Sequence, residues 1–285
     1  MQSSVLTLQT SNYSMATHVW GDHSKPYLLL LHGFLGTGDD WSAIAENLSE
    51  QWCVIAPDIP GHGKTYLADS RSELSDVQLF SLESVAAGII EILDIRECEK
   101  VYLCGYSMGG RLALYLALRF PERFQAGLIL SATAGLRSEE ERSLRRNSDE
   151  ALAQKLDTEV FSEFLDFWYN QALFAPFRRH TAFKHIVEKR RNGNPRGAAL
   201  SLLGMGTGSQ PSLWGELAQN RVPITFAAGA LDTKFTLLAE ELHQKTPHSE
   251  CRIIPDVGHV LPYECAEEIT QWCTRFFYHK LNNNL

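Results

Sequence analysis

The stretch VYLCGYSMGGRLALYLALRF, residues 101–120, decides the fold of this chain. Its first four residues, VYLC, form a short apolar run that is typical of a buried strand. The residues after Gly109 are rich in Leu and Ala, which favours a helix. Between these two parts, GYSMG turns the chain sharply, because glycine tolerates tight backbone geometry. The stretch therefore predicts a strand, a tight turn and a helix in succession.

The turn has the spacing G-x-S-x-G, which predicts an exposed, reactive serine at Ser107. A serine on such a turn needs small residues two positions away on either side, and Gly105 and Gly109 supply them. The first backbone NH of the following helix, that of Met108, would then stabilise negative charge on a substrate oxygen. The same pattern also occurs by chance in glycine-bearing loops, but the flanking strand and helix favour the catalytic interpretation.

Apolar runs upstream and downstream predict further strands, and amphipathic segments predict helices. No element is predicted for the polar first residues. The order of strands and helices indicates an α/β fold with a mostly parallel central sheet and right-handed crossovers. The predicted strands are 15–20, 27–31, 52–56, 101–104, 125–130, 222–228 and 251–254, and the predicted helices include 42–48 and 82–93.

Residues 137–204 interrupt this alternation with helical, charged and aromatic segments and no convincing strand. We expect them to form a helical cap inserted into a core made of residues 1–136 and 205–285. The cap carries twelve Lys and Arg against ten Asp and Glu, whereas the rest of the chain is strongly acidic. A cationic cap above an acidic body favours a substrate with several carboxylates, since arginine can bind a carboxylate through two hydrogen bonds.

Composition excludes several other classes of protein. The net charge is -8 and there is no run of like charges, so neither nucleic acid nor an anionic membrane is an expected partner. The six cysteines lack C-x-x-C spacing and are expected as reduced core residues. No stretch has the length of a membrane span or the pattern of a signal peptide. We expect a cytoplasmic monomer without stable membrane insertion.

A serine needs a histidine and an orienting carboxylate to become reactive. Asp232 in AGALD and His259 in DVGH each follow a predicted strand, in the chain order Ser, Asp, His. Both therefore fall at carboxyl ends of parallel strands, where α/β sites are built. Asp256 is a rival acid, but it is too near His259 in sequence to orient its ring from the usual direction, so we assign Asp232.

Two glycine-bearing loops follow the strands that precede the serine. In HGFLG the NH of Phe34 is a candidate second donor to a substrate oxygen, although a simple tight turn explains the motif equally well. In PGHG we expect His62 to shape the loop rather than to act in catalysis.

Arg111 stands four residues after Ser107 on the same predicted helix and should share its face. An arginine in the first turn of a helix that packs on a sheet loses hydration unless it lines a polar cleft. We therefore expect Arg111 to bind an anion. For most of the other arginines, including Arg178 and Arg179, a solvated helix face is the simpler interpretation.

These features resemble a known family, the α/β-hydrolase-fold enzymes of menaquinone and phylloquinone biosynthesis called 2-succinyl-6-hydroxy-2,4-cyclohexadiene-1-carboxylate synthases. The resemblance covers most of the chain, and its cap motifs are more specific than the catalytic residues. It rests on HGFLG at residue 32, PGHG at 60, GYSMGGR at 105, FWYNQALFAPF at 167 and GMGTGSQPSLW at 204.

The resemblance implies a lyase that eliminates pyruvate from 2-succinyl-5-enolpyruvyl-6-hydroxy-3-cyclohexene-1-carboxylate and needs no metal or organic cofactor. Ser107, activated by His259 and Asp232, would act as a base on a carbon-bound proton, with the NH groups of Phe34 and Met108 as the oxyanion hole.

The resemblance also assigns substrate-binding residues. Its arginines carry over to Arg111, to Arg145 and to Arg190, although adjacent arginines at 142, 146 and 191 leave the last two alignments open by one position. Trp168 matches an aromatic residue that closes over the substrate, but a tryptophan of the cap core is nearly as good an interpretation. Tyr106, next to the serine, is expected to shape the pocket.

Two other functions fit the same residues. A serine hydrolase, either an esterase or a carbon–carbon bond hydrolase acting on an acidic substrate, would use the same triad and some of the arginines. A non-catalytic receptor or scaffold of this fold is the second alternative, because some receptors keep the triad.

Overall fold

A computed structural model of the chain describes residues 4–69 and 73–277. In this described part, nine strands form one sheet in the order β1-β2-β4-β3-β6-β7-β8-β9, with β5 paired to β2. All neighbours from β4 to β9 in this order are parallel, and the pairings of β2 are antiparallel. The predicted mostly parallel sheet is confirmed. The strands are β1 (Ser4–Gln9), β2 (Tyr13–Trp20), β3 (Tyr27–Leu31), β4 (Cys53–Pro57), β5 (Tyr66–Leu67), β6 (Val101–Tyr106), β7 (Phe124–Leu130), β8 (Ile224–Gly229) and β9 (Ser249–Ile254).

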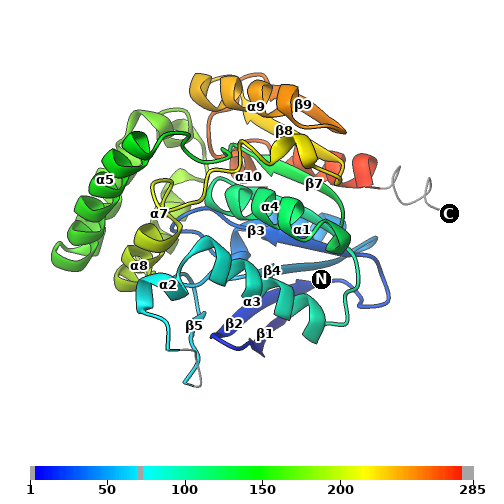
Figure 1. Cartoon of the computed structure of the whole chain (residues 1–285), viewed down its shortest axis with the longest axis horizontal. Coiled ribbons are helices and arrows are strands. Elements are labelled where there is room, and N and C mark those ends of the chain that lie inside the picture. The colour runs from blue at the N-terminus through cyan, green and yellow to red at the C-terminus, as the bar shows by residue number, and fades with distance from the viewer. Residues whose placement is uncertain (1–3, 70–72, 278–285) are drawn as a thin grey trace.

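Helices cover both faces of this sheet (Figure 1). Apolar side chains of α3, α4 and α9 pack on one face, and those of α1 and α11 pack on the other. The helices are α1 (Ser42–Leu48), α2 (Asp76–Leu79), α3 (Leu82–Ile95), α4 (Met108–Arg119), α5 (Glu139–Thr158), α6 (Phe161–Tyr169), α7 (Phe183–Arg190), α8 (Pro195–Met205), α9 (Thr233–Lys245), α10 (Leu261–Glu264) and α11 (Ala266–Trp272).

The unbroken apolar run of β3 shows why both faces must be covered. Leu29 and Leu31 belong to the hydrophobic cluster on the α3 and α4 side, whereas Leu28 and Leu30 belong to the cluster on the α1 side. All four leucines are fully buried. Since successive side chains of a strand point to opposite faces, a strand buried on both sides has no polar positions.

The first strand is an element that the sequence did not predict. β1 reads SVLTLQ and pairs with β2 at the edge of the sheet. Its side chains alternate between exposed and half-buried, and only Leu6 and Leu8 pack against the core. An edge strand with one solvated face contributes few apolar residues, so its sequence lacks the continuous run that marked the central strands.

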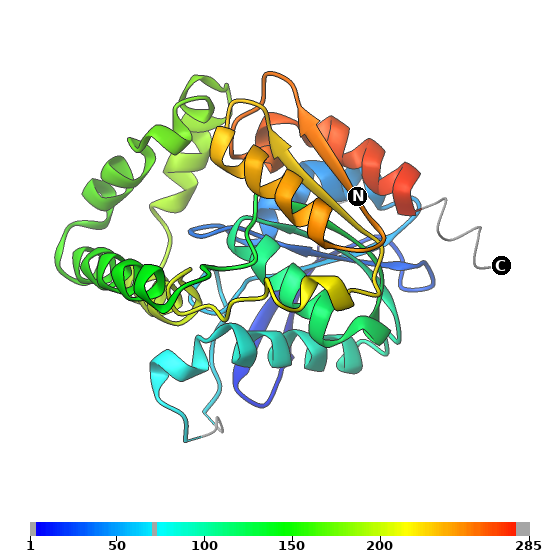
Figure 2. The ribbon, with the colours of Figure 1, turned by 45° about the horizontal axis from the view of Figure 1, so that its top comes forward.

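The helical segment between β7 and β8 contains α5, α6, α7 and α8, and residues 137–204 include no strand. In Figure 1 these helices lie together at one end of the sheet, and the turned view of Figure 2 keeps them there. They enclose an apolar cluster of their own, rich in Phe and Tyr, to which Leu35 and Val260 of the remaining chain contribute. This segment matches the predicted helical content, while its division from the core as a separate domain stays a prediction.

Two further sequence expectations concern the cysteines and membrane spans. All six cysteines are free thiols, and all are buried except the half-buried Cys251. Among residues 4–69 and 73–277, no helix combines the length and the apolar character that crossing a bilayer requires.

The turn between β6 and α4 is packed too tightly for side chains at its two glycines. A Cβ atom on Gly105 would lie 2.3 Å from the carbonyl oxygen of Gly109. A Cβ on Gly109 would lie 2.3 Å from the carbonyl oxygen of Leu31 and 2.5 Å from that of His32. The start of α4 thus rests directly on the end of β3, and both glycine positions lack room for a side chain, as the G-x-S-x-G spacing predicted.

We expect Gly109→Ala to lower the free energy of unfolding by about 2–3 kcal/mol, because the added methyl group must push α4 away from two backbone carbonyls. Gly127→Ala in β7 is the matched control, since a Cβ there would meet its nearest neighbours at 3.9 Å. The control should be neutral or slightly stabilising. Urea unfolding of both variants checks this, and equal stability of the two would contradict it.

Candidate active site

Ser107 occupies the strained position of the turn. Its backbone has φ +52° and ψ -109°, a conformation that a non-glycine residue rarely adopts and that costs about 1–3 kcal/mol. The NH of Ser107 donates to the carbonyl oxygen of Leu130 at 2.9 Å, so the end of β7 helps to hold it. This geometry presents the Ser107 hydroxyl at the carboxyl end of β6.

The structure brings Ser107, His259 and Asp232 together. Nε2 of His259 lies 3.2 Å from the Ser107 Oγ, and Nδ1 of His259 lies 2.7 Å from Oδ2 of Asp232. His259 and Asp232 are both buried. Since a carboxylate can only accept, the proton of the neutral ring belongs on Nδ1, and Nε2 is left to accept the hydroxyl proton of Ser107.

Asp232 follows β8 and also caps α9, because its carboxylate accepts the NH of Phe235. The rival Asp256 is exposed and adopts a positive φ of 59° in the turn before His259. The ring of His259 bonds to Asp232 instead, which is the partner that the chain order predicted.

A cavity of about 670 Å³ opens in front of Ser107. Residues of the sheet edge form one wall, and residues of the helical segment form the other. It gathers nine of the ten site residues that the sequence singled out, and the tenth, Asp232, lies behind His259. The nine are Ser107, His259, Phe34, Met108, Arg111, Arg145, Arg190, Trp168 and Tyr106.

The turn after β3 has the geometry of an oxyanion donor. The carbonyl oxygen of Gly33 accepts hydrogen bonds from Nδ1 of His32 at 2.8 Å and from the NH of Gly36 at 3.0 Å. Nε2 of His32 accepts the NH of Ile59, which places the ring proton on Nδ1. In a trans peptide the C=O and the following N–H point in opposite directions. Tying back the Gly33 carbonyl therefore turns the NH of Phe34 the other way.

This turn lies close to the serine. A Cβ on Gly33 would be 3.6 Å from Cβ of Ser107, and Gly109 packs the start of α4 against the same turn. The NH of Met108 is the first of α4, where the helix dipole favours negative charge. The NH groups of Phe34 and Met108 thus come from two elements that meet beside Ser107.

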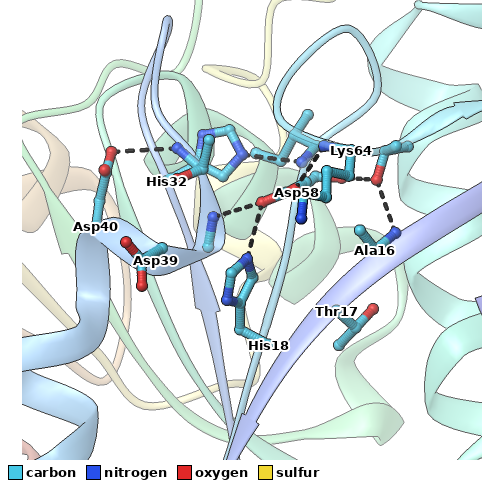
Figure 3. A network of polar contacts seen from close by, with 12 residues as sticks. Ala16, Thr17, His18, His32, Asp39, Asp40, Asp58 and Lys64 are labelled. Atoms are coloured by element: carbon cyan, nitrogen blue, oxygen red, sulfur yellow. Dashed lines mark hydrogen bonds and ion pairs between the residues drawn. The ribbon is translucent and has the colours of Figure 1, made fainter. Parts of the chain in front are cut away.

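A polar network fixes the turn from behind (Figure 3). The carboxylate of Asp58 accepts the backbone NH groups of Gly38 and Lys64, each at 2.8 Å, and lies 3.5 Å from Nε2 of His18. This network links β2, the PGHG loop and the residues that follow the turn at 32–36, which we call the oxyanion turn.

His62 lies under the same turn and has no contact with the serine. Its ring meets the rings of His32 and Phe34 edge to face, at centroid distances of 5.2 and 5.7 Å. It borders a second, smaller cavity and not the one that holds Ser107. Burial, reinforced by His32, lowers the pKa of His62 to about 3, so the ring is neutral. This position agrees with the structural role that the sequence indicated.

Arg111 is half-buried on α4 and lines the cavity. Its Nη1 donates to the carbonyl oxygen of Met205 and to Oε1 of Gln210, the latter at 2.9 Å. Burial lowers the pKa of Arg111 to about 10, with the charge of Arg145 adding to the effect, so the guanidinium remains charged near neutral pH. Its acceptors are both uncharged.

The structure resolves the ambiguity among the arginines of α5. Arg145 lines the cavity, and its Nε donates to Oδ1 of the buried Asp149 at 2.8 Å. Arg142 and Arg146 instead turn to the carbonyl oxygen of Gly208 and to Glu139. Adjacent side chains on a helix point about 100° apart, which turns Arg146 away from the direction of Arg145.

Arg190 also lines the cavity, and among the described residues its buried Nε has no hydrogen-bond partner. Its two Nη atoms bind both carboxylate oxygens of Asp40, one of them at 2.8 Å, and both residues are almost wholly buried. Burial alone would raise the pKa of Asp40, but Arg190 and Lys189 outweigh it and hold this pKa well below its usual range. The neighbouring Arg191 is half-exposed and pairs with Glu188.

Two predicted aromatic residues complete the walls. The Trp168 ring lies 5.0 Å from that of Phe34 and stacks on Phe164 at 6.1 Å. It therefore lines the cavity and packs against the apolar cluster of the helical segment, while its closing over a substrate stays a prediction. The Tyr106 ring lies 5.6 Å from that of His259. Burial raises the pKa of Tyr106, so its hydroxyl keeps its proton.

The sequence missed the acceptors that hold the three arginines, Asp40, Asp149 and Gln210. Asp40 had a readable signal, because Thr37-x-x-Asp40 is a helix-capping pattern. The other two meet their partners only through the fold. Within the described ranges, no group of three or more His, Cys, Asp or Glu side chains is placed to hold a metal ion.

Comparisons with known proteins agree with this fold. Residues 26–265 match a family described as alpha/beta hydrolase fold. The chain is 27% identical to MenH from S. aureus, whose structure superposes with a TM-score of 0.85 over 95% of this chain and 100% of that one.

Two curated relatives are similar in sequence. A putative 2-succinyl-6-hydroxy-2,4-cyclohexadiene-1-carboxylate synthase of Bacillus subtilis is 35% identical over 86% of this chain and 87% of its own length. The chloroplastic protein PHYLLO of Arabidopsis thaliana is 33% identical over 83% of this chain. The match spans only 14% of the length of the plant protein.

Acid should destabilise the protein through its buried histidines. His62 and His32 have lowered pKa values in the folded state, mainly because burial disfavours the charged ring, whereas an unfolded chain titrates them near about 6.5. Their contribution is fully present above that pH, and each histidine removes up to about 1.4 kcal/mol per pH unit as the pH falls below it. Urea unfolding between pH 7.5 and 5 measures the slope. His62→Phe should make it shallower, and an unchanged slope would contradict this.

Replacement of Asp40 should lower the free energy of unfolding far more than replacement of Asp39. Asp40→Ala leaves the buried Arg190 without its carboxylate, which we expect to cost about 3–5 kcal/mol. Asp39→Ala removes only a half-exposed partner of Lys189 and should cost at most about 1 kcal/mol. Thermal and urea unfolding of the two variants compare these costs, and similar losses would show that the Asp40–Arg190 pair is not special.

Proposed function

The chain belongs to the alpha/beta hydrolase fold family and, within it, to the 2-succinyl-6-hydroxy-2,4-cyclohexadiene-1-carboxylate synthases, and we propose that it eliminates pyruvate from 2-succinyl-5-enolpyruvyl-6-hydroxy-3-cyclohexene-1-carboxylate. The observation that carries this proposal is that one cavity is lined by both Ser107–His259 and four arginines, the fourth being Arg137. An activated serine alone would suit many substrates. Combined with cationic walls, it suits an anionic one.

In the proposed reaction Ser107 is a base. As its Oγ takes a carbon-bound proton of the substrate, the hydroxyl proton passes to Nε2 of His259, 3.2 Å away. Asp232, bonded to Nδ1 at 2.7 Å, stabilises the positive ring that results. The electron pair of the broken C–H bond forms a new carbon–carbon double bond, and the carbon–oxygen bond to the enolpyruvyl group breaks. The group leaves as the enolate of pyruvate, which becomes pyruvate by taking up a proton, and the proton on His259 is given up in return. No acyl-enzyme is needed.

The oxyanion hole is the second element of the proposal. Removal of the proton would place charge on a carbonyl oxygen of the substrate, and the NH groups of Phe34 and Met108 would receive it. The hydrogen bonds to the Gly33 carbonyl support this role, because they set the orientation of the Phe34 NH before substrate binds.

The arginines are assigned to carboxylate recognition. Arg111 is the main candidate, because its charge faces only neutral acceptors and it stands one helical turn from Ser107. Arg145 keeps its Nη groups available while Asp149 holds its Nε. Arg190 would act mainly by shaping the wall, since Asp40 occupies both of its Nη atoms.

Helices α5 to α8 are assigned the role of a cap, with Trp168 and Tyr106 closing the pocket around the ring of the substrate. The monomeric state inferred from the sequence stays a prediction. The cytoplasmic location inferred from the sequence stays a prediction.

Purified protein should release pyruvate from the enolpyruvyl substrate, as measured with lactate dehydrogenase and NADH. Ser107→Ala should lower kcat by at least about a thousandfold, because it removes the base. Ser249→Ala, at the far end of β9, is the control and should keep kcat within about twofold. A protein that hydrolyses simple esters rapidly but releases no pyruvate would be a serine hydrolase instead. Ligand binding and cellular effects that survive Ser107→Ala without any turnover would favour a receptor.

A further inference from the structure

Four arginines line the cavity, and they differ in how their charges are offset. One of them, Arg137, pairs with Glu241. Arg190 is matched by Asp40 through both of its Nη atoms. Arg111 donates only to uncharged oxygens, those of Met205 and Gln210. Arg145 has one carboxylate partner, Asp149, which it meets through Nε alone. Within the described residues, the Nη groups of Arg145 make no hydrogen bond or ion pair.

Asp149 contacts Arg145 and also lies next to the residues that hold Arg111. Its Oδ1 accepts from Arg145, and its Oδ2 lies against Gly206, where an added Cβ would come within 2.4 Å of it. Gly206 directly follows Met205, whose carbonyl holds Arg111. One buried carboxylate on α5 therefore binds one guanidinium and lies against the segment that holds the other, close enough for the charges of Asp149 and Arg111 to act on each other.

The electrostatic effects run in the same direction. The charge of Arg145 lowers the pKa of Arg111, and the charge of Asp149 raises it. Asp149 itself is only 2% exposed. Burial raises its pKa, although the charge and hydrogen bond of Arg145 and the charge of Arg111 act against this. Without Asp149, the positive charges of Arg111 and Arg145 would repel each other at a cavity wall that is partly shielded from water.

We propose that Asp149 is a positioning residue that holds Arg145 on the cavity wall and sets the joint charge of Arg111, Arg145 and Asp149 to +1, which matches this end of the cavity to one carboxylate. This inference rests on the proposed function in one respect, because it takes the cavity to receive an anionic substrate. It adds a residue that does not itself touch the ligand and that decides how strongly anions bind.

A charge series tests the inference with succinate as the probe, and its dissociation constant is measured by calorimetry. Asp149→Asn keeps the oxygen that accepts from Arg145 but raises the joint charge to +2, so succinate should bind about three- to tenfold more tightly. Arg145→Gln lowers the joint charge to zero and should weaken binding by a similar factor. The double variant returns to +1 and should bind within about twofold of the unchanged protein.

Asp157→Asn is the matched control, because Asp157 is on the same helix but pairs with the exposed Arg196 away from the cavity. It should leave the dissociation constant unchanged. If Asp149→Asn weakens succinate binding as much as Arg145→Gln does, or leaves it unchanged, the charge-setting role is wrong. The same holds if the double variant binds no better than Arg145→Gln.

The comparison of Arg145→Gln with the double variant decides the question even if Asp149→Asn alone fails to fold, since neither protein contains the Arg145–Asp149 bond. In pyruvate-release assays, Asp149→Asn should change KM by more than kcat, as expected of a residue that acts on binding. The binding series needs no turnover. A protein that follows the series yet releases no pyruvate would keep this inference and lose the proposed reaction.

Discussion

The close contact between the start of α4 and the end of β3 is the constraint on which the active site depends. Gly109 lies so near the carbonyl oxygens of Leu31 and His32 that no side chain fits there. This contact forces Ser107 into its strained conformation and brings the turn after β3 beside it. Backbone packing therefore places the serine and both candidate oxyanion donors. The flanking helices and strands keep that arrangement rigid.

A second principle governs the walls of the cavity, where buried guanidinium groups require acceptors. The chain provides three kinds: neutral oxygens for Arg111, one shared carboxylate for Arg145 and a two-point carboxylate for Arg190. In the part of the chain that the structure describes, no carboxylate is bonded to Arg111, one carboxylate oxygen is bonded to Arg145, and both oxygens of a carboxylate are bonded to Arg190. The site thus contains less positive charge than its arginine content suggests, and the most available charge is that of Arg111, one helical turn after Ser107.

Much of this architecture was predictable because its signals are local. The central strands are continuous apolar runs such as YLLLL in β3, and Ser107, Asp232 and His259 follow strands in a recognisable order. The edge strand β1 was missed because half of its side chains face solvent. Gln210 was missed because it meets Arg111 of a distant helix, and Asp149 because it meets Arg145 one helical turn away. Whether Arg145 or Arg146 faces the cavity depends on how α5 is rotated about its axis. Such facts belong to tertiary packing and leave no periodicity in the sequence.

The Asp40–Arg190 pair also limits how this protein could be rebuilt. Asp40 follows the oxyanion turn, Arg190 ends α7, and the pair is almost wholly buried between them. A designer could treat the helices between β7 and β8 as an interchangeable module, to be exchanged for new specificity. A foreign insertion without a cation equivalent to Arg190 would leave the buried carboxylate of Asp40 unpaired, shortly after the turn that holds Phe34. Recombination at this boundary must therefore exchange position 40 together with the helices.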